Sequence, residues 1–242
     1  MIESALQKFA LMGASWVLYL LLAMSIFSIG IICERAMYFR SHSGDVDKLG
    51  NDLLRFLKAG DRRAAEALLQ ASKSIEAAIL LPALAWLDGG AESVSEALES
   101  STVRKRGELE RGLTSLGTLG NNAPFVGLFG TVIGVIQAFH MLGSSGGGGN
   151  QAAMGNVIVA ISDALIATGV GLIVALPAVV GYNLAQKKVS SIENNVSVIS
   201  KQILALLKAE PKLLAQFAAS TELSAEEEAA GEVTGNEQPE LS

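Results

Sequence analysis

Residues 156–182 read NVIVAISDALIATGVGLIVALPAVVGY, and these 27 residues include a single charged side chain, Asp163. About 20 apolar residues in a helix span the ~30 Å hydrocarbon core of a bilayer, because each residue adds about 1.5 Å. Two other stretches carry no charge at all: residues 14–33 (ASWVLYLLLAMSIFSIGIIC) and residues 121–143. We therefore predict an all-α integral membrane protein with transmembrane helices at 14–33, 121–143 and 156–182.

The composition agrees with this class of protein. Half of the 242 residues are hydrophobic and 17% are charged, whereas a soluble domain carries about 25% charged residues. One cysteine excludes an intrachain disulfide framework and a Cys-rich metal site, and two histidines do not make a His-cluster site. The net charge of −6 argues against binding to nucleic acid. We expect neither a metal nor a cofactor.

The first apolar stretch has a second interpretation as a signal peptide, because Lys8 precedes it. A signal sequence has an apolar region of about 7–15 residues and ends at a cleavage site of small residues. Here the apolar run is longer, and it ends with bulky Ile31 and Ile32 before Cys33. Bulky Ile32 also disfavours Cys33 as a lipoprotein cysteine, so we predict a retained transmembrane helix.

The positive charges predict the orientation, because cytoplasmic segments carry the excess of Lys and Arg. Residues 34–120 contain 12 Lys and Arg, and the segment after residue 182 contains five. Residues 1–13 contain only Lys8, and the Gly-rich loop 144–155 contains none. We therefore expect residues 1–13 and 144–155 to be periplasmic, and residues 34–120 and the C-terminus to be cytoplasmic.

The cytoplasmic segments carry helical patterns. We predict a helical domain at 34–120, in which Ile79–Leu87 is a buried core helix rather than a fourth span. Asp61 is expected to cap a helix, Ser93 to begin a capping box, and the helix that follows to continue into the second span. After the third span we predict a helix at 183–219, ending or kinking near Pro211, and a disordered acidic tail at 220–242 with seven Glu and no Lys or Arg.

One apolar seam of the helix at 183–219 repeats at coiled-coil spacing. The seam consists of Ile192, Val196, Ile199, Ile203 and Leu206. It packs either against the chain's own helix near residues 94–118 or against another subunit, and the pattern is compatible with both.

Small residues form one face of each of the last two spans. Close approach of backbones through small residues drives helix association in lipid. The second span has Gly127, Thr131, Gly134 and Ala138 on one face, with Gly130 and Gly134 in a GxxxG motif; the third has Ala164, Thr168, Gly171, Ala175 and Ala178. These faces predict either tightly packed helices or a lined cavity.

Thr131 and Thr168 fall near the midpoints of their apolar stretches, so we expect both hydroxyls near the bilayer centre. A membrane threonine commonly bonds a carbonyl of its own helix, and that role competes with a second one, in which both hydroxyls line a path for a proton or a charged group. Asp163 is five residues outward of Thr168. A charge within a span is costly and usually functional, although an acid near the surface can simply meet water.

Two blocks of sequence carry a resemblance to a known family. They are residues 123–139 (APFVGLFGTVIGVIQAF) and residues 163–183 (DALIATGVGLIVALPAVVGYN), and Glu34-Arg35 after the first span also fits. The chain resembles the ExbB/TolQ/MotA family of bacterial inner-membrane motor subunits, and is more similar to the ExbB and TolQ branch because the flagellar branch typically has four spans.

The resemblance implies a homopentamer that encloses the membrane helices of an ExbD/TolR-like dimer, a single-span partner whose Asp carries the proton. It further implies a TonB/TolA-like energy transducer as a possible third component. The family's two membrane threonines correspond to Thr131 and Thr168, and its span-three acid, usually Glu, corresponds to Asp163. The function implied is that of a stator subunit that couples proton flow to mechanical work on the envelope.

Three other classes of function compete with a stator subunit. A non-conducting oligomeric scaffold would keep the small faces without needing the hydroxyls. An enzyme is disfavoured, because Gly146–Gly149 lack the Gly-Lys-Ser/Thr of a P-loop and no His or Cys accompanies a serine. A secondary transporter usually shows internal repeats, which the three dissimilar spans lack. The machine that is driven, and the choice of proton or sodium, stay open.

Overall fold

The computed structural model describes residues 15–144, 151–213 and 216–217, with side chains of the second stretch described from Met154 onward. Residues 1–13, residues 145–150 of the Gly-rich loop and the tail 220–242 lie outside the described residues, as do the predictions made for them. The described residues form helices and turns, with no strand among them. The chain divides into two compact units, Met1–Tyr38 with Glu110–Lys187 (the span unit) and Phe39–Leu109 with Lys188–Ser242 (the bundle unit).

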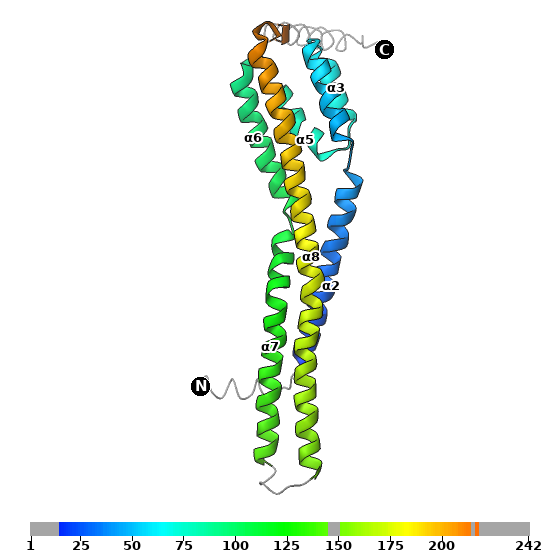
Figure 1. The fold of residues 1–242 in the computed structure, drawn as a ribbon, viewed down its shortest axis with the longest axis vertical. Helices are drawn as coiled ribbons and strands as arrows, with labels where there is room; N and C mark the ends of the chain where they lie inside the picture. Colours follow the sequence, from blue (N-terminus) through cyan, green and yellow to red (C-terminus); the bar gives the residue numbers. More distant parts are fainter. Residues whose placement is uncertain (1–14, 145–150, 214–215, 218–242) are drawn as a thin grey trace, which may run out of the picture. The chain divides into compact units, whose positions relative to one another are not determined.

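Three helices are long and apolar enough to cross a membrane. They are α2 (Ser15–Ser41), α7 (Leu113–Ser144) and the 59-residue α8 (Gln151–Ala209), all labelled in Figure 1. Each contains one of the predicted apolar stretches in its described part, so the prediction of an all-α membrane protein is confirmed. The helices are longer than the predicted spans, because α2 continues to Ser41 and α7 begins at Leu113.

The bundle unit is built from short helices and the last part of α8. The short elements are α3 (Val46–Lys58), α4 (Arg62–Ala71), α5 (Ile75–Leu84), the 3₁₀ turn η1 (Leu87–Gly89) and α6 (Gly90–Leu109). Polar side chains begin three of them: Asp45, Asp61 and Ser74 each accept a hydrogen bond from a backbone N–H in the first turn. The predicted cap at Asp61 is thus present, and Gly60, with φ of 72°, ends the preceding helix.

Helix α5 is a core helix of the bundle unit. It has only ten residues, and Ile79 and Leu80 are 2% and 1% exposed. It is long and apolar enough to cross a membrane only if it is counted together with residues 87–109, from which a 59° bend separates it. Most of its residues are buried, which supports a core helix, but the helix is Ile75–Leu84 rather than the predicted 79–87.

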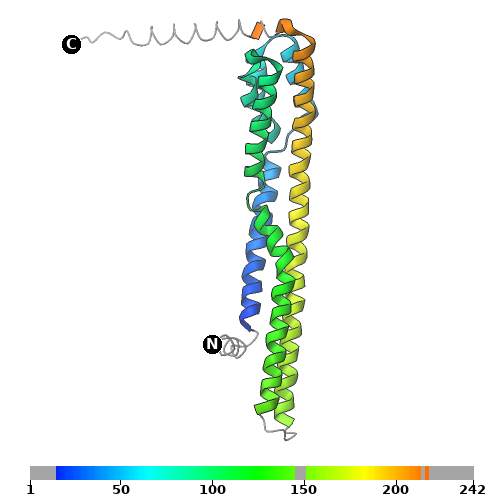
Figure 2. The same cartoon turned by 90° about the vertical axis from the view of Figure 1, so that its left-hand side faces the viewer.

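The seam predicted in the last part of α8 is buried inside this same chain. Its five residues are 1–7% exposed. A Cβ on Gly50 of α3 would lie 3.2 Å from Ile199, and Arg106 of α6 forms an ion pair with Glu193 at 3.3 Å. Figure 2 shows α6 and this part of α8 running alongside each other. Of the two expected partners of the seam, the chain's own helices are therefore the ones observed.

Two predictions about helix ends were wrong. Ser93 does not begin a helix, because α6 already starts at Gly90, and the Ser93 hydroxyl donates instead to the Gly89 carbonyl. The helix expected to run unbroken into the second span stops at Leu109, and α7 begins at Leu113. Gly112 has φ of 80°, a conformation that only glycine adopts without strain, so the chain turns there. Pro211 follows the end of α8 at Ala209, as expected.

Candidate functional site

The small faces of α7 and α8 pack directly against each other. A Cβ on Gly127 would lie 2.7 Å from the carbonyl oxygen of Ala167 and 3.2 Å from the Cα of Gly171. In the other direction, a Cβ on Gly171 would lie 3.1 Å from the Cα of Gly127. Real Cβ atoms do not approach backbone so closely, so only glycine permits this spacing. The small faces therefore form a helix–helix seam.

The remaining small residues extend this seam in both directions. A Cβ on Gly134 would lie 2.6 Å from the Ala164 side chain, and one on Gly130 would lie 2.8 Å from that of Ala167 and 3.2 Å from Val17 of α2. Ala175 is 6% exposed and belongs to an apolar cluster with Leu21 and Ala123. Three helices thus meet along the seam, where its glycine and alanine residues allow close packing.

These contacts also fix how the three helices line up along their axes. Val17, in the first turn of α2, is level with Gly130 and Ala167, while Ile32 is level with Gly181. Thr131 and Thr168 follow Gly130 and Ala167 in sequence, so both lie level with the beginning of α2. These contacts align the helices with one another, and the position of both hydroxyls near the bilayer centre stays a prediction. Each apolar stretch has its own midpoint, and the three stretches are staggered.

The two threonine hydroxyls are in different situations. The Thr131 hydroxyl donates to the Leu128 carbonyl at 2.6 Å, the local bond that a membrane threonine commonly forms. The Thr168 hydroxyl is buried and has no hydrogen-bond partner within the described part of the chain. A buried hydroxyl without a partner costs about 1–3 kcal/mol. The structure thus places both threonines at one level of the seam, with Thr168 holding the unused hydrogen-bonding group.

Asp163 lies apart from the threonines, in a cavity of about 410 Å³. Three other polar side chains line this cavity, which also has apolar walls: Ser15 of α2, Gln137 of α7 and Asn156 of α8. None of these four polar side chains bonds to another described residue. Sequence reasoning named Asp163 but missed Gln137 and Asn156, whose distance along the chain gives no sign that they share a cavity.

Charged residues mark the opposite end of the span unit. Glu34 pairs with Arg35 at 3.0 Å, Arg35 also lies over the Tyr38 ring, and Gln186 donates to Glu110 at 3.5 Å. Arg111 and Lys187, the neighbours of that last pair, are exposed. We call Glu34, Arg35, Glu110, Arg111 and Lys187 the charged collar. It ends the apolar surface of all three helices at one level.

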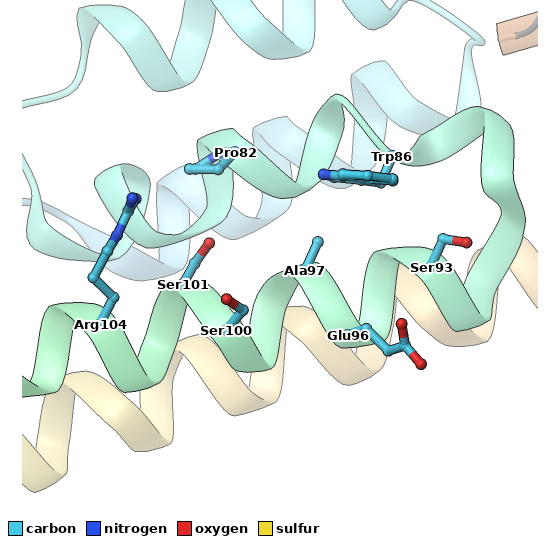
Figure 3. A pocket seen from close by; sticks show the side chains of 8 residues that line it. All are labelled: Pro82, Trp86, Ser93, Glu96, Ala97, Ser100, Ser101 and Arg104. Carbon is cyan, nitrogen blue, oxygen red and sulfur yellow. The ribbon is translucent and has the colours of Figure 1, made fainter.

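The bundle unit has a cavity of its own, of about 360 Å³, between α5 and α6 (Figure 3). The Trp86 ring and Pro82 face Ala97, Ser100 and Ser101 across it, with Arg104 at one end (Figure 3). Trp86 is 58% exposed. Within the ranges that the structure describes, no three His, Cys, Asp or Glu residues gather closely enough to hold a metal ion.

Large apolar side chains cover the outside of the span helices. Only 22–28% of the apolar windows of α2, α7 and α8 is buried. Side chains such as Ile26, Phe125 and Leu165 are 65–66% exposed. In water such surface would be unstable, and lipid or neighbouring membrane helices are its natural surroundings. The fold and this surface together define a multi-pass, all-α membrane protein.

Comparison with known proteins identifies the family. The sequence profile of the MotA/TolQ/ExbB proton channel family matches residues 70–197, more than half of the chain. The chain therefore belongs to the MotA/TolQ/ExbB proton channel family. The matched range contains α6, α7 and the part of α8 that packs against α7, whereas α2 lies outside it. This family groups membrane channel subunits rather than enzymes.

Individual relatives agree with the family. The chain is 41% identical to the Tol-Pal system protein TolQ of Pseudomonas aeruginosa over 96 residues, 40% of either chain. It is 42% identical to the biopolymer transport protein ExbB of Xanthomonas campestris over 101 residues, 42% of this chain and 38% of the relative. It is 45% identical to ExbB of Neisseria gonorrhoeae over 76 residues, 31% of this chain and 33% of the relative. The matches span less than half the length of these relatives.

Proposed function

We propose that this chain is the stator subunit of an inner-membrane motor driven by the proton-motive force. In this proposal it forms a homopentamer around an ExbD/TolR-like single-span partner and couples proton flow to mechanical work on the cell envelope. The work would be TonB-type import, Tol-type envelope maintenance or gliding motility. Membership of a proton channel family and the similarity to TolQ and ExbB support it.

The orientation follows from the charged collar. Lys and Arg gather on the cytoplasmic side of membrane proteins, so the collar faces the cytoplasm and the loop 144–155 faces the periplasm. A hydrocarbon core of ~30 Å corresponds to about 20 helical residues. Counted from Lys187 along α8, it reaches Ala167. Thr131 and Thr168 then lie at the outer boundary of the hydrocarbon core, and Asp163 lies four residues, or about 6 Å, outside it.

The proposal rests above all on the charge content of the described spans. Between residues 121 and 182, Asp163 is the only residue among Asp, Glu, Lys and Arg. One proton crossing ~100 mV releases ~2.3 kcal/mol, but a proton path needs groups that exchange protons along it. A chain with one boundary acid and two hydroxyls cannot relay protons across the bilayer alone. The titrating carboxyl is therefore supplied by the partner.

The threonines act as hydrogen-bonding partners for that carboxyl. Once protonated, the partner's acid is neutral and passes the seam without exposing a charge to lipid. The buried Thr168 hydroxyl, which lacks a partner in this chain, is available to bond it. Thr131 can offer a lone pair while its proton stays on the Leu128 carbonyl. Repeated binding and release would move the partner relative to this subunit.

Substitution of the two hydroxyls tests the proposal. Thr131→Val and Thr168→Val are introduced into the full chain, produced together with its partner, and checked for assembly. Proton-driven activity should fall strongly in both, whereas Thr102→Val, which removes a similar local bond to the Leu98 carbonyl in the bundle unit, should leave activity unchanged. Normal activity in assembled threonine variants would favour the alternative function, a non-conducting oligomeric scaffold.

A further inference from the structure

We propose that the cavity beside Asp163 is a vestibule that admits a hydrated monovalent cation from the outer side of the membrane, with Gln137 and Asn156 as its binding amides. The inference rests on the proposed function, which it extends by naming the route of entry. The cavity has a volume of about 410 Å³ and lies between α2, α7 and α8 of a single chain. That volume is enough for an ion with several waters.

The position of the cavity along the helices suits an entrance. Asn156 is seven residues, or about 10.5 Å, further outward on α8 than Asp163. Gln137 is six residues, or about 9 Å, further outward on α7 than Thr131. The cavity therefore runs from the loop end of the helices to the Asp163 carboxylate, just outside the hydrocarbon core. An ion that enters beside Asn156 reaches Asp163 without crossing hydrocarbon.

The chemistry of the lining favours a cation. Asp163 is the only formal charge of residues 121–182, and the loop 144–155 contributes no Lys or Arg that would compete for it. The amide oxygens of Gln137 and Asn156 and the hydroxyl oxygen of Ser15 can accept hydrogen bonds from the waters around a cation. None of these side chains is engaged by another described residue. Polar groups without protein partners at this depth face water.

The next group inward also lacks a partner. Thr168 lies five residues, or about 7.5 Å, inward of Asp163 on the same helix, and its hydroxyl is buried and unpartnered. Asp163 thus stands between a wet cavity and a dry hydrogen-bonding group. Asp163 would pass a proton, or draw a cation, from the cavity toward the level of Thr168, where the partner's acid would bind.

Cysteine labelling tests whether the cavity is open to water. Gln137→Cys and Asn156→Cys are each introduced into the full chain, which also carries Cys33→Ser and is produced together with its partner. A cationic, membrane-impermeant thiol reagent is added to spheroplasts, in which the outer face of the inner membrane is accessible. The reagent should label both variants. The controls, Phe125→Cys and Ile173→Cys, replace side chains that are 66% and 70% exposed on the same helices, lie within the hydrocarbon core counted from Lys187 and do not line the cavity. The controls should stay unlabelled.

Ion dependence tests whether the amides bind the cation. In Gln137→Leu and Asn156→Leu, the outer ion concentration that gives half-maximal activity should rise about ten- to hundred-fold, the effect of losing one hydrogen bond to a charged group. The maximal rate should stay unchanged, and Asn156→Gln should restore normal ion dependence. Titration of outer pH and, separately, of outer Na⁺ shows whether the cation is hydronium or sodium.

The outcomes separate this inference from the proposed function. Absence of labelling at both positions, or an unchanged half-saturating concentration, overturns the vestibule even if Thr131→Val and Thr168→Val abolish activity. A fall in maximal rate without a change in half-saturation also overturns it, because that pattern belongs to conduction or assembly. Normal activity in the assembled threonine variants instead refutes the proposed function.

Discussion

Gly127 and Gly171 face each other so closely that a Cβ on one would lie 3.1–3.2 Å from the Cα of the other. At this point α7 and α8 touch through their backbones. Association of helices in lipid depends on such contacts, since no hydrophobic force drives them together there. The geometry makes specific demands on each position of the seam, which substitution can test.

Alanine at either glycine should destabilise the protein by about 1–3 kcal/mol, the range for overpacking. In Gly127→Ala the new methyl would meet the Ala167 carbonyl oxygen at 2.7 Å, and backbone cannot move aside as a side chain does. Thermal unfolding in detergent measures the change. Gly169→Ala is the control, because a Cβ there has nothing within 4 Å. Equal stability of Gly127→Ala and Gly169→Ala would contradict the seam.

Thr168→Val should leave the protein as stable as before or up to about 1 kcal/mol more stable, because it removes a buried hydroxyl without a partner. Thr131→Val should be neutral to slightly destabilising, because it removes the bond to the Leu128 carbonyl. The unfolding midpoints of the two variants are measured in the same detergent and compared with that of the unaltered protein. A clear loss of stability in Thr168→Val would mean that its hydroxyl has a structural partner. A gain in stability with a loss of activity is the pattern of a functional residue.

Removal of the Asn195 amide should cost the bundle unit about 1–3 kcal/mol. Glu76 is 4% exposed, and its carboxylate accepts a hydrogen bond from the Asn195 amide at 3.0 Å. Asn195→Ala leaves this buried acid without its partner, whereas Glu76→Gln keeps an oxygen that can accept the bond. Glu76→Gln should therefore cost less than Asn195→Ala. Thermal unfolding of Asn195→Ala, of Glu76→Ala and of the variant with both alanines gives the coupling between the two side chains. Additive effects would show that the bond contributes nothing.

Gly112→Ala should destabilise the protein by about 1 kcal/mol, because φ of 80° strains any residue with a Cβ. The space around Gly112 is not the cause, since the nearest atom, on Ile31, would lie 3.5 Å away. Gly107→Ala, in the last turn of α6 with open space around it, should instead stabilise by up to about 0.5–1 kcal/mol. Chemical denaturation of both variants tests the pair, and a stabilising Gly112→Ala would argue for a continuous helix.

Apolar length and charge placement were sufficient to predict the class of fold. An uncharged run of 20 residues leaves few alternatives to a spanning helix, and burial of the Ile192–Leu206 seam followed from its spacing. The small faces were also readable, because Gly, Ala and Thr recur every three or four residues on both helices. The sequence did not show which surfaces these faces contact. In the structure they pack against each other.

Axial alignment and tertiary neighbours were beyond the reach of the sequence. Hydropathy gives each helix a length but does not say which residue of α2 lies beside Gly130, so the alignment of Val17 with the level of the threonines came only from the structure. Gly107, Gly117 and Gly120 are all helical while Gly112 has positive φ, and the residue type alone does not distinguish them. Gln137 and Asn156 became candidates only when folding placed them around one cavity with Asp163.

The turn at Gly112 distinguishes the two long helices that pack against each other. Helix α7 begins at Leu113, directly after this turn, and is thereby separated from α6. Helix α8 runs over 59 residues, and no glycine with positive φ lies within its described part. The direction of α7 is therefore set by the backbone conformation of one glycine, whereas the direction of α8 is set by the continuous hydrogen bonding of a single helix.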